Sequence, residues 1–357
     1  MKKKELSKVI VIGSLAVLLA IAIPLAGGCA PQSAEPEGET PTGEVSTYTL
    51  RVQVGFGPPE TDALIRPYFR KIEAASDGQL KFEIYTVGEL CPDDMMMESL
   101  MAGTVDLAQQ TGAHAAVPLD ISPFDSASPF AWSSAMELTT LWYEKGMREI
   151  FTEAYEEMGN IKWIGYFPTD PTHIITKEPV YHLEDLNGLK LDAMANVAEV
   201  LDQFGVTSVA LPREELYLSG QTGIIDGLAD MGATEAHANS FDEVFPYFLD
   251  NPINGAWLCW WLINEDTWNS LPAHLQDVLV TGLKAGALDA LIYYYEGEAA
   301  SRKYFTVTHM PAEEWNQLRE YALSQWDSYA EASPRAAELV QIIRDYNAEV
   351  ESTKWWR

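Results

Sequence analysis

Short apolar strands alternate with helical segments in the first part of the chain, and this alternation limits the fold more than any other feature. Strands are expected at 48–55, 80–85 and 105–110, with helices at 57–76 and 93–102 between them. Strands that are joined by helices usually form a parallel sheet with crossover connections. The pattern therefore predicts an α/β fold.

The same alternation starts again after residue 160. Strands are expected at 161–167, 189–192, 209–211 and 224–230. The restart predicts two α/β units rather than one, and the 357 residues are enough for two domains of ordinary size.

One predicted helix is too long for a single small α/β unit. Residues 273–307 contain no proline and carry leucines, valines and isoleucines at helical spacing. We expect this helix to span both units, although glycine lowers helix stability and occurs there at three positions, 282, 286 and 297. Two amphipathic helices, at about 312–330 and 335–349, follow it.

The N-terminal residues have the pattern of a secretion signal rather than of a folded element. A lysine-rich head precedes an uncharged, mostly apolar run from Val9 to Ala26. The sequence Leu25-Ala26-Gly27-Gly28-Cys29 resembles a bacterial lipoprotein processing site, with Ala26 where leucine is usual. The resemblance implies removal of residues 1–28 and lipidation of Cys29. A retained anchor helix and a plain cleaved signal are the alternatives.

Residues 29–47 are expected to form the lipidated N-terminus and a disordered tether, because they are rich in Pro, Glu, Gly, Ser and Thr. This arrangement predicts an extracytoplasmic protein held at the membrane through Cys29. Loss of four lysines and one glutamate with the signal changes the formal net charge from −30 to −33. Such an acidic chain without a basic stripe is not expected to bind nucleic acid.

Motifs of catalysis are missing from the sequence. It has no Gly-rich phosphate loop, Gly-x-Ser-x-Gly, His-Glu-x-x-His or Cys-x-x-Cys, and its six histidines are scattered. The many carboxylates make chance pairs unavoidable, so spacing cannot identify a catalytic couple. We therefore expect a protein that is not an enzyme. Cys91 and Cys259 are interpreted as two buried thiols, with pairing as the alternative.

Three ordered motifs resemble the substrate-binding proteins of TRAP transporters, the DctP-like extracytoplasmic solute receptors. The first joins Gly88-Glu89-Leu90 to Ala102-Gly103-Thr104-Val105-Asp106. The second is Asp185-Leu186-Asn187-Gly188-Leu189-Lys190, and the third joins Glu215-Leu216-Tyr217 to Gly223-Ile224-Ile225-Asp226-Gly227. The resemblance covers roughly residues 48–330.

The resemblance implies a two-domain fold of the periplasmic-binding-protein type, with a cleft between the domains and a long helix that spans them. Domain I would comprise 48–168 and about 258–297, and domain II about 169–257 and 298–357. Such a receptor captures a small solute and delivers it to the membrane permease subunits of an ion-gradient-driven transporter. A secreted α/β hydrolase with paired carboxylates and a receptor of an ATP-driven importer are the alternatives.

The ligand class is open because the arginine that clamps a carboxylate in most of the family is missing. Asp192 stands at its position, and Asp170 lies in the upstream stretch where a second arginine often occurs. The solute could be neutral or cationic, or it could be an organic acid held through calcium or sodium by Asp192 and Glu215. In a third interpretation another arginine, such as Arg213, enters the cleft. No other cofactor is expected.

Aromatic and amide side chains complete the candidate ligand site. Trp257, Trp260 and Trp261 follow a predicted turn where the chain crosses between domains, and Trp260 faces the opposite side from the other two in a strand. Phe56 follows the first strand, and Gln110 ends the third, where open α/β sheets bind ligands. The candidate ligand-binding residues are Phe56, Gln110, Asp170, Asp192, Glu215, Trp257 and Trp260.

Overall fold

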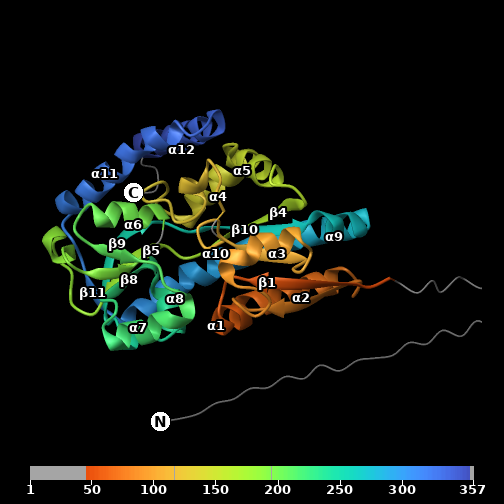
Figure 1. Cartoon of the computed structure of the whole chain (residues 1–357), viewed down its shortest axis with the longest axis horizontal. Coiled ribbons are helices and arrows are strands. Elements are labelled where there is room, and N and C mark those ends of the chain that lie inside the picture. The colour runs from red at the N-terminus through yellow and green to blue at the C-terminus, as the bar shows by residue number, and fades with distance from the viewer. Residues whose placement is uncertain (1–45, 116, 194, 354–357) are drawn as a thin grey trace, which may run out of the picture. The chain divides into compact units, whose positions relative to one another are not determined.

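The computed structural model describes residues 46–353 except 116 and 194, and these residues belong to one compact unit. The predicted signal and nearly all of the predicted tether lie outside the described residues. Two sheets organise the described part of the chain, and they lie on opposite sides of the view in Figure 1.

The first sheet contains the three predicted N-terminal strands, one strand that returns from later in the chain, and the strand at 161–168, where the sequence pattern restarts and a second unit is expected to begin. β1 pairs in parallel with β2 and β3, whereas β10 runs antiparallel between β3 and β4. Its strands, in spatial order, are β2 (Leu80–Tyr85), β1 (Tyr48–Val54), β3 (Leu107–Gln110), β10 (Leu258–Asn264) and β4 (Ile161–Pro168).

The second sheet contains six strands. β6 pairs in parallel with β7 and β8, while β5 runs antiparallel to both β8 and β9. Its strands, in spatial order, are β11 (Thr306–Thr308), β9 (Tyr247–Asn254), β5 (Thr172–Thr176), β8 (Gly227–Met231), β6 (Lys190–Asp192) and β7 (Thr207–Val209).

The parallel pairing expected from the alternation is present in part of each sheet, but β10 and β5 run antiparallel to their neighbours. The α/β class and the two-domain type of fold are confirmed. β4 continues into β5, and β9 continues into β10, so two direct connections carry the chain from one sheet to the other without a crossover helix. A strand entered in this way is free to run antiparallel to its neighbours. Two strands of the second sheet are also displaced slightly: β7 begins two residues before its predicted start and β8 three residues after.

Helices cover the faces of the two sheets. Residues Thr61–Ile65 form a π-helical turn between α1 and α2, inside the segment that the sequence predicts as one helix. The helices are α1 (Pro58–Glu60), α2 (Arg66–Ala75), α3 (Met96–Met101), α4 (Ala135–Glu144), α5 (Met147–Glu156), α6 (Ala195–Asp202), α7 (Leu216–Thr222), α8 (Ala233–Ala238), α9 (Glu265–Ser270), α10 (Ala273–Ser301), α11 (Ala312–Ala330) and α12 (Pro334–Thr353).

The long helix predicted to span both units is α10, and its 29 residues are continuous. It packs on β4 and α2 beside the first sheet and on α8 beside the second. Its glycines permit these close approaches: a Cβ on Gly286 would lie 2.9 Å from the Tyr68 ring, and one on Gly297 would lie 2.5 Å from Thr234. Close packing thus offsets the intrinsic cost of glycine in a helix.

The C-terminal helix α12 lies on α4 and α5, beside the first sheet, although the sequence analysis assigned residues 298–357 to the second domain. The exact domain boundaries remain a prediction. Within the described ranges, no helix is both long and apolar enough to cross a membrane.

Candidate functional site

A cavity lies where the two sheets meet, at the carboxyl ends of β1, β3 and β8. Ligands of open α/β sheets bind at such strand ends. The cavity has a volume of about 20 Å³, roughly the space of one water molecule. The half of the protein built on the first sheet and the half built on the second are therefore closed on each other. The lining residues of the cavity are Gly55, Phe56, Gln109, Gln110, Thr111, His114, Thr169, Arg213, Asp230, Glu235, Trp257 and Cys259.

The apolar walls of the cavity are aromatic. Phe56 follows β1, and Trp257 precedes β10, so each side chain comes from a strand end of the first sheet. Trp257 is 6% exposed, and its Nε1 has no hydrogen-bond partner within the described residues. One unused donor therefore lies in the wall of the cavity.

The first sheet also contributes amide groups. Gln110 Nε2 donates to Asp93 at 2.7 Å, and its Oε1 accepts from the backbone amide of Thr111 at 2.9 Å. A Cβ at residue 55 would lie 2.3 Å from Gln110 Nε2, so a larger residue there would displace this amide. Gln110 is thus held in place by its neighbours.

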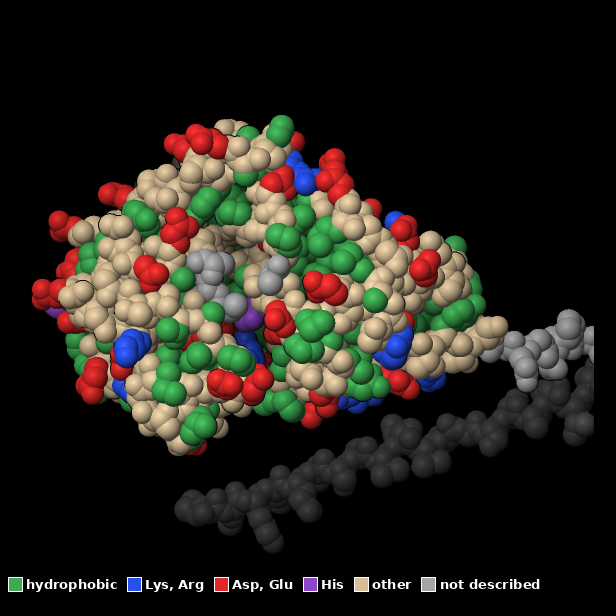
Figure 2. Space-filling view, viewed as in Figure 1, with side chains coloured by type: hydrophobic (Ala, Val, Ile, Leu, Met, Phe, Trp, Pro, Cys, Tyr) green, Lys and Arg blue, Asp and Glu red, His purple; other side chains and the backbone are tan. Residues whose placement is uncertain are grey.

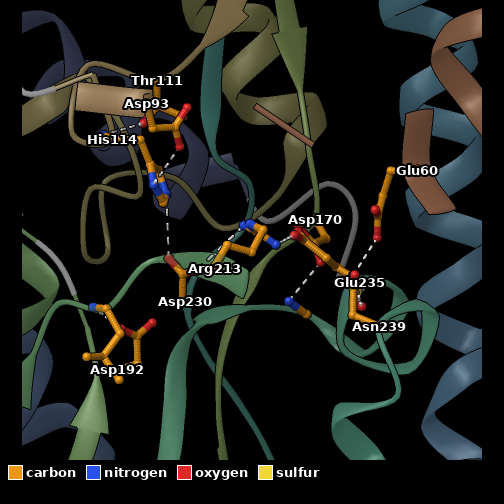
Figure 3. Close-up of polar contacts among 12 residues, drawn as sticks. Glu60, Asp93, Thr111, His114, Asp170, Asp192, Arg213, Asp230, Glu235 and Asn239 are labelled. Carbon is orange, nitrogen blue, oxygen red and sulfur yellow. Dashed lines mark hydrogen bonds and ion pairs between the residues drawn. The ribbon is translucent and has the colours of Figure 1, made fainter. Parts of the chain in front are cut away.

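The second sheet contributes the principal cation, Arg213. It lies in a 3-10 turn that follows β7, and its guanidinium donates to Glu235 of α8. Arg213 Nη2 lies 3.7 Å from Asp230 Oδ2. Both acidic partners are buried, with about 5% of each exposed, so the charge of Arg213 is already engaged by residues of its own half (Figure 3).

Carboxylates outnumber cations around Arg213. Burial alone would lower its pKa, but the charges of Asp230, Glu60, Asp170 and Asp93 raise it. Burial raises the pKa of Glu60, Asp93 and Asp170, and for Asp170 the nearby Glu298 adds to the effect. One guanidinium does not neutralise the group formed by Glu60, Asp93, Asp170, Asp230 and Glu235, which we call the acidic cluster.

His114 stands between the two halves within this cluster. Its Nδ1 lies 4.0 Å from Asp93 of the first half, and its Nε2 lies 3.9 Å from Asp230 Oδ1 of the second. Both distances exceed those of a hydrogen bond. Figure 3 shows the ring between Asp93 and Asp230. The ring also packs against Trp257, with 5.5 Å between the centroids, so it links the aromatic wall to the acidic cluster.

Hydrogen bonds at the rim join the two halves. Asn239 Nδ2 donates to Glu60 Oε1 at 2.8 Å, and Asn196 Nδ2 donates to the carbonyl oxygen of Pro123 at 2.6 Å. Each pair has one member from the first half and one from the second. Separation of the two halves would break both contacts.

Three of the predicted site residues, Phe56, Gln110 and Trp257, line the cavity. Asp170 is buried next to the lining residue Thr169 but does not itself line the cavity, and it accepts a hydrogen bond from the Gly232 amide at 2.8 Å. Asp192 is buried but does not line the cavity, and its Oδ1 accepts from the Leu211 amide at 3.1 Å.

Glu215 and Trp260 lie elsewhere. Glu215 is exposed in the turn that contains Arg213. Trp260 is fully buried in the apolar core, on the face of β10 that meets Tyr155, because alternate residues of a strand face opposite sides. Neither side chain lines the cavity.

In the acidic cluster and its histidine, sequence reasoning missed Glu60, Asp93, His114, Asp230 and Glu235. Asp230 could have been found, because it lies near the end of a predicted strand and the same argument selected Gln110. His114, Asp93 and Glu235 carry no comparable signal, since only the packing of the two halves brings them together.

The two residues predicted to hold a cation, Asp192 and Glu215, do not come together at the cavity. Asp192 uses one oxygen on a backbone amide, and Glu215 is exposed. Within the part of the chain that the structure describes, no three His, Cys, Asp or Glu residues are grouped as a metal site.

The two cysteines of the described chain are not paired with each other. Cys91 and Cys259 are free, buried thiols, as the sequence analysis expected.

A comparison with family models identifies the chain. The model described as bacterial extracellular solute-binding protein, family 7 (DctP) matches residues 58–332. The chain therefore belongs to this family of TRAP periplasmic solute-binding proteins, as the three sequence motifs predict. It is an extracytoplasmic solute receptor.

Individual relatives agree with this assignment and differ in what they bind. A monocarboxylate 2-oxoacid-binding periplasmic protein of Nostoc sp. is 21% identical over 293 residues, which cover 78% of this chain and 77% of that protein. A TRAP solute-binding protein of Chromohalobacter salexigens with bound (S)-(+)-2-amino-1-propanol is 28% identical, with a TM-score of 0.82 and coverage of 86% and 97%. A third, from Pseudoalteromonas atlantica with sodium and pyruvate, is 21% identical, with a TM-score of 0.76 and coverage of 87% and 97%.

Proposed function

We propose that this receptor captures a small solute in the cavity between its sheets and passes it, chemically unchanged, to the membrane permease subunits of a TRAP transporter. The observation that carries the proposal is a cavity lined from both halves and sealed by hydrogen bonds between them. A solute enters only when the halves separate, and its contacts with both halves then favour closure.

We also propose that the solute carries no free carboxylate clamped by arginine. Arg213 does enter the cavity, as the third sequence interpretation held, but it is already paired with Glu235 and Asp230. A carboxylate ligand would have to take Arg213 from a buried acid. Leaving a buried charge unpaired costs about 3–5 kcal/mol. The amino alcohol bound by the Chromohalobacter relative supports the alternative of a neutral or cationic solute.

Ligand-induced stabilisation tests the receptor proposal. A solute that binds only the folded protein raises its melting temperature by mass action. We expect one class of small solute to raise the melting temperature of the purified protein while mass spectrometry recovers the solute intact. Conversion of the solute would instead support the hydrolase alternative.

Membrane attachment through Cys29 forms a separate part of the proposal, and it rests on the sequence Leu25-Ala26-Gly27-Gly28-Cys29. Cys29→Ser is expected to release the protein from the membrane fraction. Mass spectrometry of the wild-type N-terminus should find a diacylated cysteine. An unmodified mature N-terminus elsewhere in the chain would contradict lipidation.

A further inference from the structure

Two residues that line the cavity each carry a buried polar atom without a partner among the described residues, one an acceptor and one a donor. Asp230 is 5% exposed, lines the cavity, and its Oδ1 has no hydrogen-bond partner among the residues described. Trp257 Nε1 is the unused donor. The ring of His114 lies between these two side chains, which places them at neighbouring points of the wall.

The two carboxylate oxygens of Asp230 lie in different surroundings. Asp230 Oδ2 faces Arg213 at 3.7 Å, whereas Oδ1 faces His114 at 3.9 Å, beyond hydrogen-bond distance. A buried carboxylate oxygen without a donor is unfavourable, because desolvation of the charge is not compensated. A ligand group that donates hydrogen bonds and carries positive charge would satisfy it best.

The surroundings of Asp230 favour the same charge. Asp93 lies on the far side of His114, within 4.0 Å of its ring. The indole of Trp257 presents an aromatic face, which attracts cations, and tryptophan is the strongest of the aromatic residues in this respect. Acidic side chains are also spread over the face of the molecule in Figure 2, with few basic ones among them.

We propose that the solute carries an ammonium group that binds Asp230 Oδ1 beside Trp257, and a hydrogen-bond acceptor such as a hydroxyl that receives the Trp257 Nε1 proton. This inference rests on the proposed receptor function and names the ligand class. Arg213 then acts as a positioning residue, because it fixes Asp230 and Glu235 and does not contact the ammonium group.

The test compares compounds that differ in one group. Amino alcohols of two to four carbons are titrated into the purified protein by calorimetry, beside the diols and hydroxy acids of equal length. At least one amino alcohol is expected to bind about 10- to 100-fold more tightly than its matched diol, because a charged hydrogen bond replaces a neutral one. The hydroxy acids are expected to bind most weakly.

Variants assign the effect to one carboxylate. Asp230→Asn should lower amino alcohol affinity about 10- to 100-fold and leave diol affinity within about threefold. Asp192→Asn is the matched control, since Asp192 is a buried aspartate on the adjacent strand that does not line the cavity, and it should change neither affinity by more than about threefold.

Several results would overturn the ammonium inference. They are a hydroxy acid that binds as tightly as the matched amino alcohol, no binding by any amino alcohol, or an Asp230→Asn protein with unchanged affinity. If diols or hydroxy acids bind and raise the melting temperature without conversion, the receptor function stands and only the ammonium inference fails. Conversion of a bound solute would refute the receptor function itself.

Discussion

Asp192 and Asp230 occupy adjacent parallel strands and have different fates. Asp192, at the end of β6, lies opposite Leu228 of β8. Asp230 is two residues further along β8, on the same face and about 6–7 Å nearer the carboxyl end of the sheet. That displacement puts Asp230 in the cavity wall, while Asp192 stays behind it, bonded to the Leu211 amide.

The comparison separates a carboxylate that stabilises local backbone from one available to a ligand. Burial and the charge of Asp230 raise the pKa of Asp192 to about 7, partly offset by the Leu211 amide and Arg213. Both residues are acidic, buried and near Arg213, yet only Asp230 presents an unused oxygen to the cavity. The strand register, rather than residue type, decides which of them can meet a solute.

The largest expected effect comes from removing Arg213, the cation whose charge acts on both aspartates. Arg213→Met leaves Glu235 and Asp230 buried without their partner, and we expect a loss of about 3–5 kcal/mol in the free energy of unfolding at pH 8. Chemical denaturation measures this loss. The matched control is Arg344→Met, whose exposed ion pair with Asp327 at 2.8 Å should cost about 0–1 kcal/mol. Equal losses in the two variants would show that the buried pairing contributes no more than an exposed one.

The pH dependence of stability tests the assignment of Asp192. Its pKa in the folded protein, about 7, lies above the ordinary aspartate value of 3.8, so the folded protein holds the proton more tightly. This contribution is fully present below the unfolded pKa and is lost as pH rises through about 7. Unliganded wild-type protein should therefore become less stable between pH 5.5 and 8.5, as measured by its melting temperature. Asp192→Asn should show a smaller decrease, and identical slopes would contradict the raised pKa.

Trp260 of β10 and Trp257, the residue just before that strand, extend the comparison to apolar side chains. Trp260→Phe should lower the free energy of unfolding by about 1–3 kcal/mol, because Trp260 is fully buried in the core. Trp257→Phe should cost less stability but weaken solute binding, since Trp257 lines the cavity. Denaturation and calorimetry on both variants measure the two effects. The reverse pattern would exchange the assignments of the two side chains.

The smallest expected effect concerns the rim. Asn239→Ala removes the hydrogen bond to Glu60 between the halves. Closure should become less favourable by about 0.5–1.5 kcal/mol, which lowers solute affinity roughly 2- to 10-fold, mainly through faster dissociation. Stopped-flow fluorescence measures the rate. Gln221→Ala, whose exposed bond to Tyr217 lies within the second half, is the control and should leave the rate unchanged.

The sequence predicted most of the architecture because hydrophobic periodicity and the positions of glycine and proline are local signals. The restart of the strand pattern indicated two α/β units, and the absence of proline indicated the helix that became α10. It did not predict that β10 and β5 run antiparallel to their neighbours, since strand direction depends on how the chain passes between sheets. The packing of α12 beside α4 and α5 is likewise a long-range contact.

For the site, the sequence alone determined the family and the extracytoplasmic setting of such receptors, and it has Asp192 where the family resemblance implies an arginine. It also identified Phe56, Gln110 and Trp257 as residues at strand ends. Only the tertiary structure decided that Arg213 enters the cavity already paired, that His114 lies between the halves, and that Asp230 rather than Asp192 faces the solute. The physical reason is strand register. Asp192 lies opposite Leu228, so Asp230, two residues further along β8, lies nearer the carboxyl end of the sheet. Which residues of neighbouring strands lie opposite each other depends on how the strands pair, and no local pattern in the sequence encodes it.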